Sequence, residues 1–320
     1  MSGLPCGPKA AFATKGYFAK QRNRRGRQLG RVLASRSEEV VVDRLFAGTT
    51  QLNQGLQPLM EAAETTLCLS EYQRSRSIVR LDSGGGSLDD VNWLLARGYL
   101  VHTKDYSGQR ARRLAATVTE WFDDPKWPQR QVGWITEPAG VYVRPVVRIA
   151  VRSRQQNGQW AVGVLISAVP ACDVLSLTGH AASLVTDPVA VLLAYVTFYD
   201  QRGGGIETSF KGDKQGLGLT KRSKKRFEAQ QMLMLLGSLA HNVIVWARRW
   251  LRAATSQLQH YGILRMVRDV FHISGFLLFD STGHLLQIVL NQDALLAHAL
   301  LNSFRELLAP MHLVISLDKT

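Results

Sequence analysis

The chain has 320 residues, enough for one large domain or roughly two to three smaller ones. Its apolar content of 46% excludes a largely disordered chain, because a substantial core can be buried. Lysine and arginine outnumber aspartate and glutamate by 39 to 25, a formal net charge of +14. Such a surplus indicates a polyanionic partner, with nucleic acid ahead of an acidic membrane surface.

Cysteines and histidines give no sign of a disulfide framework or a zinc site. Cys6, Cys68 and Cys172 are scattered and odd in number. The histidines, too, are dispersed, without zinc-ligand spacing: His102, His180, His241, His260 and His272. No apolar run reaches the roughly 18 residues of a membrane span, and no signal-peptide core follows the amino terminus. We therefore expect a cytoplasmic protein, associated with the nucleoid if its partner is DNA, and no membrane contact.

The first 122 residues predict an α/β sheet that is partly parallel, because strands alternate with helices. Met1–Pro8 has the composition of a loop. Strands are expected over Gln28–Ser35, Glu39–Leu45, Ile78–Asp82 and Tyr99–Thr103. Helices are expected over Gln54–Leu69, Leu88–Arg97 and Arg110–Trp121.

The composition changes at Asp123, where tryptophan and proline become frequent and apolar residues alternate. Residues 123–187 predict a β-rich insertion, with strands over Val141–Val151 and Trp160–Val169 around a Gln-Gln-Asn-Gly turn. Residues 188–260 predict helices over Pro188–Phe198, from about Ile206, and over Phe227–Ala254. Residues 261–320 predict an α/β tail, with a hairpin over Phe271–Leu290 that turns at Ser281-Thr282-Gly283 and a helix over Asn291–Leu308.

Asp82 is the first candidate site residue. It follows a short apolar strand and opens into Ser83-Gly84-Gly85-Gly86-Ser87. Ligands bind at such strand ends in open α/β sheets, and three glycines let a bulky backbone such as DNA approach closely. One alternative is a nucleotide-phosphate loop, although the Lys-Ser/Thr of a P-loop is missing. The other is that Asp82 only caps the next helix.

The segment from Tyr199 to Lys214 holds the second candidate site. It places one carboxylate, Glu207, among Tyr199, Arg202, Lys211 and Lys214. A helix starting near Ile206 would put Glu207, Lys211 and Lys214 on one face, at i, i+4 and i+7. An acid that can hold a divalent metal, beside cations that can hold phosphate, suits phosphodiester chemistry. The alternative is an exposed helical face with an ordinary Glu–Lys pair.

Basic residues are concentrated in two segments. Thr14–Arg36 carries eight basic side chains and no acid, and Arg202–Arg226 carries eight against two acids. We predict that DNA phosphates are contacted by the first group: Arg22, Arg24, Arg25 and Arg27. The alternative is a solvated basic face.

These motifs resemble a known family. Arg80-Leu81-Asp82-Ser83-Gly84-Gly85-Gly86-Ser87, followed by Asn92-Trp93-Leu94-Leu95-Ala96-Arg97-Gly98-Tyr99, resembles the region of the second catalytic acid in DDE-type insertion-sequence transposases. Tyr199, Arg202, Glu207 and Lys214 resemble the Tyr-Arg-Glu-Lys signature around the third acid in one group of them. Here four residues separate Arg202 from Glu207, where the signature has three, and the usual six separate Glu207 from Lys214.

The resemblance implies an RNase H-like mixed sheet with flanking helices, interrupted by a β-rich insertion. It implies DNA cleavage and strand transfer at insertion-sequence ends, dependent on Mg²⁺ (or Mn²⁺), with Asp82 and Glu207 as catalytic metal ligands. Arg202 and Lys214 would hold phosphates, and Tyr199 would stack on or hydrogen-bond to DNA. The implied partners are the terminal inverted repeats, the target DNA and a second protomer on DNA.

The first catalytic acid of that family is expected just upstream of a Ser-Gly-Leu-Pro-like segment. Here Met1-Ser2-Gly3-Leu4-Pro5 begins the chain, and neither Asp43 nor Asp105 has a matching context. We therefore expect an amino-terminal truncation or a misassigned start, and little or no activity for this polypeptide. The alternative function is a catalytically inactive, DNA-binding transposase remnant. A basic RNA-associated protein is a third class, for which no recognition signature is present.

Overall fold

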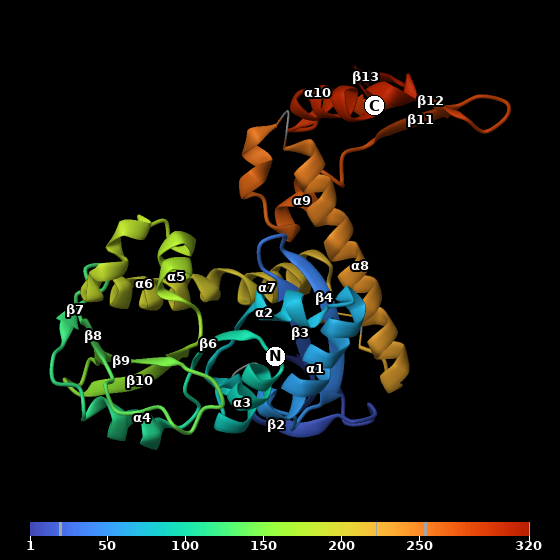
Figure 1. Cartoon of the computed structure of the whole chain (residues 1–320). Helices are drawn as coiled ribbons and strands as arrows, with labels where there is room; N and C mark the ends of the chain where they lie inside the picture. The colour runs from blue at the N-terminus through green and yellow to red at the C-terminus, as the bar shows by residue number, and fades with distance from the viewer. Residues whose placement is uncertain (19–20, 222, 253–254, 320) are drawn as a thin grey trace. The chain divides into compact units, whose positions relative to one another are not determined.

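The computed structural model describes residues 1–18, 21–221, 223–252 and 255–319 (Figure 1). These residues form ten α-helices and three β-sheets, which confirms the expected mixed α/β class. The chain divides into two compact units. The first unit contains Met1 and Thr50–Gly205, and the second contains Ser2–Thr49 and Ile206–Thr320. This division does not coincide with the expected boundaries at 122/123, 187/188 and 260/261.

The first unit is built on one six-stranded mixed sheet. Its strands β5 and β6 are parallel, and every other neighbouring pair is antiparallel. The spatial order is β5 (Ile78–Arg80), β6 (Leu100–Lys104), β10 (Trp160–Ser167), β9 (Val147–Arg154), β8 (Arg130–Trp134) and β7 (Phe122–Asp123).

This strand order shows how the expected β-rich residues 123–187 are arranged. Leu165 of β10 pairs with Lys104 of β6, so strands on both sides of the expected boundary at residue 122 share one sheet. The change in composition at Asp123 therefore marks the start of an antiparallel part of the same sheet. The hairpin of β9 and β10 around Gln155–Gly158 is confirmed.

Helices cover both faces of this sheet: α4 lies on one face and α5 and α6 lie on the other (Figure 1). Leu192 and Tyr195 of α6 pack with Val132, Ile149 and Leu165 of the sheet. The helices of this unit are α1 (Leu52–Leu67), α2 (Glu71–Ser75), α3 (Leu88–Ala96), α4 (Gly108–Ala115), α5 (Ala171–Leu177) and α6 (Pro188–Asp200).

Two elements of this unit have one end far from the expected position. Helix α4 ends at Ala115 rather than Trp121, because the β-branched run Thr117-Val118-Thr119 follows it. Strand β9 begins at Val147 rather than Val141, because Pro145 has no N–H to donate to a sheet ladder.

The second unit contains an antiparallel sheet centred on its longest strand, β3. Three strands pair with β3, and all pairings are antiparallel. The strands are β1 (Ser2–Pro5), β2 (Thr14–Phe18), β3 (Gln21–Ala34) and β4 (Glu39–Ala47). The prediction of a loop over Met1–Pro8 was wrong for Ser2–Pro5, because Gly26–Leu29 of β3 supplies a pairing partner that overrides the loop-like composition.

Four helices and a small sheet complete the second unit. The helices are α7 (Ile206–Gly216), α8 (Phe227–Leu251), α9 (Ile263–Asp269) and α10 (Ala297–Leu308). The sheet consists of β11 (Gly275–Phe279), β12 (Leu285–Asn291) and β13 (Val314–Asp318), with β11 antiparallel and β13 parallel to β12. The expected hairpin that turns at Ser281–Gly283 is confirmed. Within the described ranges, no helix has both the length and the apolar character to cross a bilayer.

Candidate functional site

Asp82 lies in the loop that follows strand β5, beside its parallel neighbour β6. Its Oδ1 accepts a hydrogen bond from the N–H of Gly84 at 2.9 Å, which caps a 3₁₀ turn over Ser83–Gly85. The next helix, α3, is capped by Ser87 instead. Oδ2 of the half-buried Asp82 accepts no hydrogen bond from the described residues, so one carboxylate oxygen is left for a ligand.

The glycine-rich loop is held against strand β6. The hydroxyl of Thr103 donates to the backbone O of Asp82 at 3.2 Å, and the N–H of Tyr106 donates to the O of Gly86 at 3.0 Å. A Cβ on Gly86 would lie 1.8 Å from the carbonyl O of Lys104, so only glycine fits there. These contacts fix the backbone of the loop and therefore the position of Asp82.

Tyr199 and Arg202 gather around Asp82 in the first unit. Tyr199 lies in the last turn of α6, and Arg202 follows in a 3₁₀ turn over Gln201–Gly204, with its guanidinium carbon 5.3 Å from the Tyr199 ring centre. Burial raises the pKa of Tyr199; the positive charge of Arg202 opposes this, and the negative charge of Asp82 adds to it. Two motifs far apart in the sequence thus share one charged cluster.

Arg80 of β5 and His102 of β6 also belong to this cluster. Nη1 of Arg80 donates to the carbonyl O of Phe198 at 3.3 Å, and its pKa is lowered by burial and by the charge of Arg202. Because Arg80 and Arg202 are close enough for their charges to interact, this part of the first unit has an excess of positive charge that suits an anion such as phosphate.

His102 is fully buried on β6, opposite Arg80 in the strand register. Neither ring nitrogen has a hydrogen-bond partner among the described residues, and the ring lies 5.0 Å from that of Phe198. Burial and the charge of Arg80 lower its pKa to about 3. From the sequence, we rejected His102 as a zinc ligand and assigned it no other role. Its position between the apolar Val101 and Thr103 of a central strand was the available signal of burial.

We expect His102 to make the chain less stable in acid. The unfolded residue takes up a proton near pH 6.5 and the folded residue only near pH 3, so unfolding is increasingly favoured as the pH falls between these values. The contribution is at most about 1.4 kcal/mol per pH unit. Urea denaturation at pH 7, 6, 5 and 4 should show a smaller loss of unfolding free energy for His102→Leu than for the unmodified chain. His180→Leu, at an exposed position of the same unit, should keep the full loss. Equal pH slopes for all three proteins would contradict this prediction.

Glu207, Lys211 and Lys214 lie in the second unit, on helix α7, which begins at Ile206 as expected. Glu207 and Lys211 are exposed, and within the described ranges they make neither an ion pair with each other nor any other hydrogen bond or salt bridge. The alternative of an ordinary Glu–Lys pair is therefore not formed. Both side chains are available to a ligand.

Lys214 is half-buried and holds α7 to strand β1. Its Nζ donates to Oγ of Ser2 at 2.7 Å and to the carbonyl O of Gly3 at 3.0 Å. Burial lowers its pKa. Since an ammonium has three N–H donors, one remains for a phosphate oxygen.

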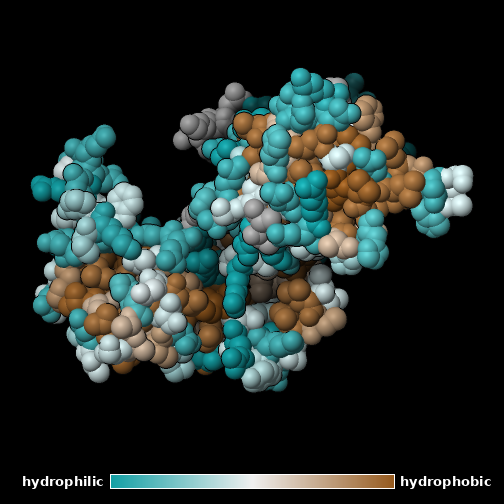
Figure 2. Space-filling view, turned by 90° about the horizontal axis from the view of Figure 1, so that it is seen from above, coloured by the Kyte–Doolittle hydropathy of each residue, from teal (hydrophilic) through white to brown (hydrophobic). Residues whose placement is uncertain are grey.

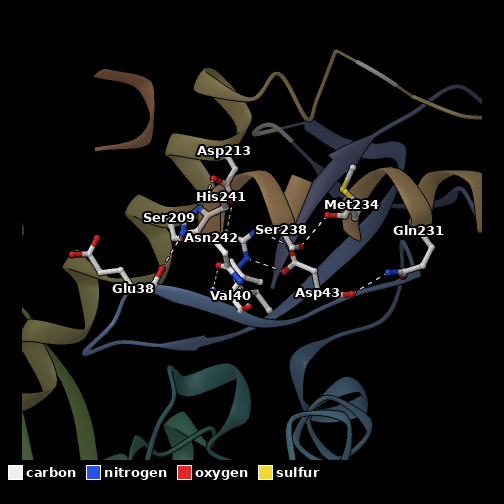
Figure 3. A network of polar contacts seen from close by, with 11 residues as sticks. Glu38, Val40, Asp43, Ser209, Asp213, Gln231, Met234, Ser238, His241 and Asn242 are labelled. Carbon is white, nitrogen blue, oxygen red and sulfur yellow. Dashed lines mark hydrogen bonds and ion pairs between the residues drawn. The ribbon is translucent and has the colours of Figure 1, made fainter. Parts of the chain in front are cut away.

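The inner face of α7 is anchored by a buried polar network (Figure 3). Arg31 of β3 donates to both carboxylate oxygens of Asp43 at 2.8 and 2.6 Å, and to Oδ2 of Asp213 at 2.6 Å. All three side chains have an exposure of 0%. Asp213 also contacts Nδ1 of His241 at 2.7 Å. The network therefore ties β3, β4, α7 and α8 together, and it occupies the carboxylate of Asp43.

Asp105, the other carboxylate considered for the first acid, is also occupied. It accepts two hydrogen bonds from Arg110, at 2.6 and 2.7 Å, and its side chain is fully buried. Among the described residues, no three His, Cys, Asp or Glu side chains form a group that could hold a metal ion.

The predicted basic cluster needs one correction. Arg27 is 1% exposed, and its guanidinium donates to the carbonyl oxygens of Ala11, Lys224 and Lys225 at 2.7, 3.0 and 2.9 Å. It is therefore a structural residue and is not available to DNA. Desolvating a guanidinium requires partners, and the three carbonyls supply them.

The remaining cluster residues are distributed differently. Arg24 and Arg25 are exposed on β3, and Nη1 of Arg25 donates to the carbonyl O of Ala13 at 3.0 Å. The side chain of Arg22 lies outside the described residues. Arg27 holds the backbone of Lys224 and Lys225, and Arg25 lies two residues from Arg27 on the same face of β3. The two basic segments therefore meet in one basic surface, which we define as Arg25, Lys224 and Lys225.

The structure thus brings Asp82, Tyr199 and Arg202 together in the first unit, and Glu207, Lys211 and Lys214 on one helix of the second. Comparison with models of known protein families and with curated protein sequences finds no match to this chain.

Proposed function

We propose that the chain is a DNA transposase of the DDE type, which cleaves DNA and transfers strands at the ends of an insertion sequence. The observation that carries this proposal is the cluster of Asp82, Tyr199 and Arg202, because the resemblance assigns the same residues to the second acid and the third-acid signature. An acid with a free oxygen in the same cluster as a guanidinium group is suited to a phosphodiester.

We propose Mg²⁺ (or Mn²⁺) as the metal of this transposase. Asp82 and Glu207 offer hard carboxylate oxygens, and Mg²⁺ is commonly held by one or two carboxylates together with substrate phosphates. When bound, the metal would activate the attacking hydroxyl group and stabilise the leaving oxygen. The chain itself would supply the cations: Arg80, Arg202 and Lys214 hold phosphate, and Tyr199 meets DNA as a neutral phenol.

An RNase H-like core is the finer fold that we propose for the mixed α/β architecture. It is supported by the parallel pair β5–β6 with an acid in the loop after β5, and by a second acid in the first turn of a later helix. The partners we propose are inverted-repeat DNA, target DNA and a second protomer on DNA.

A catalytically inactive, DNA-binding remnant is the second candidate function. It is favoured by the basic surface, which is built by Arg27 independently of either acid. A basic surface of this kind binds phosphates without any contribution from a metal site.

A cleavage assay separates the two candidates. Duplex DNA with the inverted repeats that flank the coding sequence is incubated with the chain in Mg²⁺, Mn²⁺ or EDTA. A second protein is extended by the in-frame codons upstream of Met1, where the family's first acid is expected. Metal-dependent cleavage at the repeat end by either protein supports the transposase. Binding without cleavage by both supports the remnant, and the absence of both binding and cleavage overturns both proposals.

We expect DNA binding to depend steeply on salt, because each lysine or arginine that binds a phosphate releases counterions. The double variant Lys224→Ser/Lys225→Ser should reduce the slope of log K against log salt concentration by roughly 0.9 for each phosphate that it no longer binds. Arg36→Ser, in the turn between β3 and β4, is the control and should leave the slope unchanged. Fluorescence anisotropy from about 50 to 300 mM salt measures this. Equal slopes for all three proteins would exclude the basic surface as the DNA-binding surface.

A further inference from the structure

Strand β11 is an edge strand whose two faces are both open to solvent in the part of the chain that the structure describes. It pairs with β12 along one side, and its other side joins no described strand. Its large apolar side chains are about half exposed: Phe276 56%, Leu277 58%, Leu278 47% and Phe279 55%. In a sheet with one buried face, alternate residues would be buried. Both faces of β11 are therefore left partly open by the described residues.

The helix that covers this small sheet does not reach β11. Leu300 and Phe304 of α10 pack in one hydrophobic cluster with Ile288 and Leu290 of β12 and with Leu317 of β13, and the cluster contains no residue of β11. Helix α10 thus packs on β12 and β13, and β11 lies outside this hydrophobic cluster.

Further exposed apolar side chains lie next to β11. Leu286 on β12 and Phe271 before β11 are also exposed, by 52% and 48%. At about 200 Å² for a large side chain, six such residues expose roughly 600 Å² of apolar area. Exposed apolar patches of this size commonly mark an interaction site. Figure 2 shows a broad hydrophobic area over the carboxy-terminal part of the molecule, beside a hydrophilic protrusion.

The chemistry of β11 favours a second copy of the chain as the partner. Gly275–Phe279 contains no charged residue, although the chain carries +14, so a charged partner would find no complement here. Natural edge strands are commonly protected by lysine or proline, and β11 has neither. Two antiparallel β11 strands related by a two-fold axis would satisfy each other's backbone groups with the same residues.

We propose that β11 of one chain pairs antiparallel with β11 of a second copy, which joins the two three-stranded sheets into one six-stranded sheet. This pairing satisfies the free backbone edge of β11 and brings the side chains of Phe276 to Phe279 into cross-strand contact with those of the other copy. It depends on this sheet alone and not on the proposed transposase function, so the dimer forms without DNA.

Light scattering coupled to size-exclusion chromatography tests the proposal on the full chain, whose single-copy mass is 35.6 kDa. The unmodified chain should show twice this mass. Leu277→Lys should raise the dimer dissociation constant by about 10-fold, because residue 277 at the middle of β11 would place two like charges opposite each other across the two-fold axis. Val314→Lys is the matched control: it lies on β13, at the opposite edge of the sheet, and is equally exposed at 58%, so its dimer should persist.

Hydrogen exchange of the unmodified chain provides a test that depends on no variant. The β11 amides should be protected, and protection should fall on dilution below the dissociation constant. The proposal would be overturned by any of three results. The chain could be a monomer at about 100 μM, Leu277→Lys could leave the dimer as strong as before, or β11 of a monomer could be protected only when lipid vesicles are added.

Discussion

Arg31→Met is expected to lower the free energy of unfolding by about 3–5 kcal/mol, the usual effect of breaking a buried ion pair on one side. The methionine fills a similar volume, but the fully buried carboxylates of Asp43 and Asp213 lose their charged donor. The loss should loosen α7, which carries Glu207. Urea denaturation followed by circular dichroism measures the effect.

Two comparisons make this prediction specific. Arg268→Met removes an arginine of the second unit that is 64% exposed and paired with Asp269, and it should change the urea midpoint little. The triple variant Arg31→Met/Asp43→Leu/Asp213→Leu should recover much of the loss, since no charge is then left buried. If Arg31→Met is as stable as Arg268→Met, the network does not hold the second unit together.

Asp82→Asn and Glu207→Gln are each expected to lower metal-dependent DNA cleavage by about a thousandfold or more in whichever protein proves active. Each change keeps the shape of the side chain and removes the charge that a divalent metal requires. DNA affinity should persist or increase slightly, because a negative charge is removed near phosphate. Single-turnover cleavage with saturating protein separates this effect from binding.

Matched controls for both acids are available. Asp89→Asn changes an exposed acid in the first turn of α3, and Glu228→Gln changes an exposed acid in the first turn of α8. Both should cleave at the unmodified rate. If the Asp82 and Glu207 variants cleave as fast as these controls, the carboxylates hold no catalytic metal, and the proposed function is wrong. Loss of circular dichroism signal in a variant would instead assign its effect to folding.

Elements whose signals are local were predicted well. The turn at Gln155–Gly158 and the turn at Ser281–Gly283 both form hairpins, and α7 begins at Ile206. Turn chemistry and side-chain periodicity act over a few residues, so these features are encoded where they occur. The same holds for Asp82, whose strand and glycine-rich loop are adjacent in sequence.

Features that depend on distant partners were missed. Ser2–Pro5 becomes a strand only because β3 pairs with it. Arg27 and Arg31 belong to a basic run, yet their partners Lys224 and Asp213 lie 197 and 182 positions further along the chain. Periodicity and motif spacing act over short stretches of sequence, so they cannot predict contacts between residues so far apart. The network around Asp213 is invisible to periodicity for the same reason.

By itself, the sequence determined the α/β class, the main hairpins and helices, and the segments in which acids and cations are concentrated, because each of these follows from local pattern and composition. Only the tertiary structure decided which charges remain available to a ligand. It buried Arg27, Arg31, Asp43 and Asp213 with partners and left Glu207 and Lys211 exposed. The physical reason is desolvation: a charge removed from water must be neutralised by neighbours, and those neighbours come from distant parts of the chain.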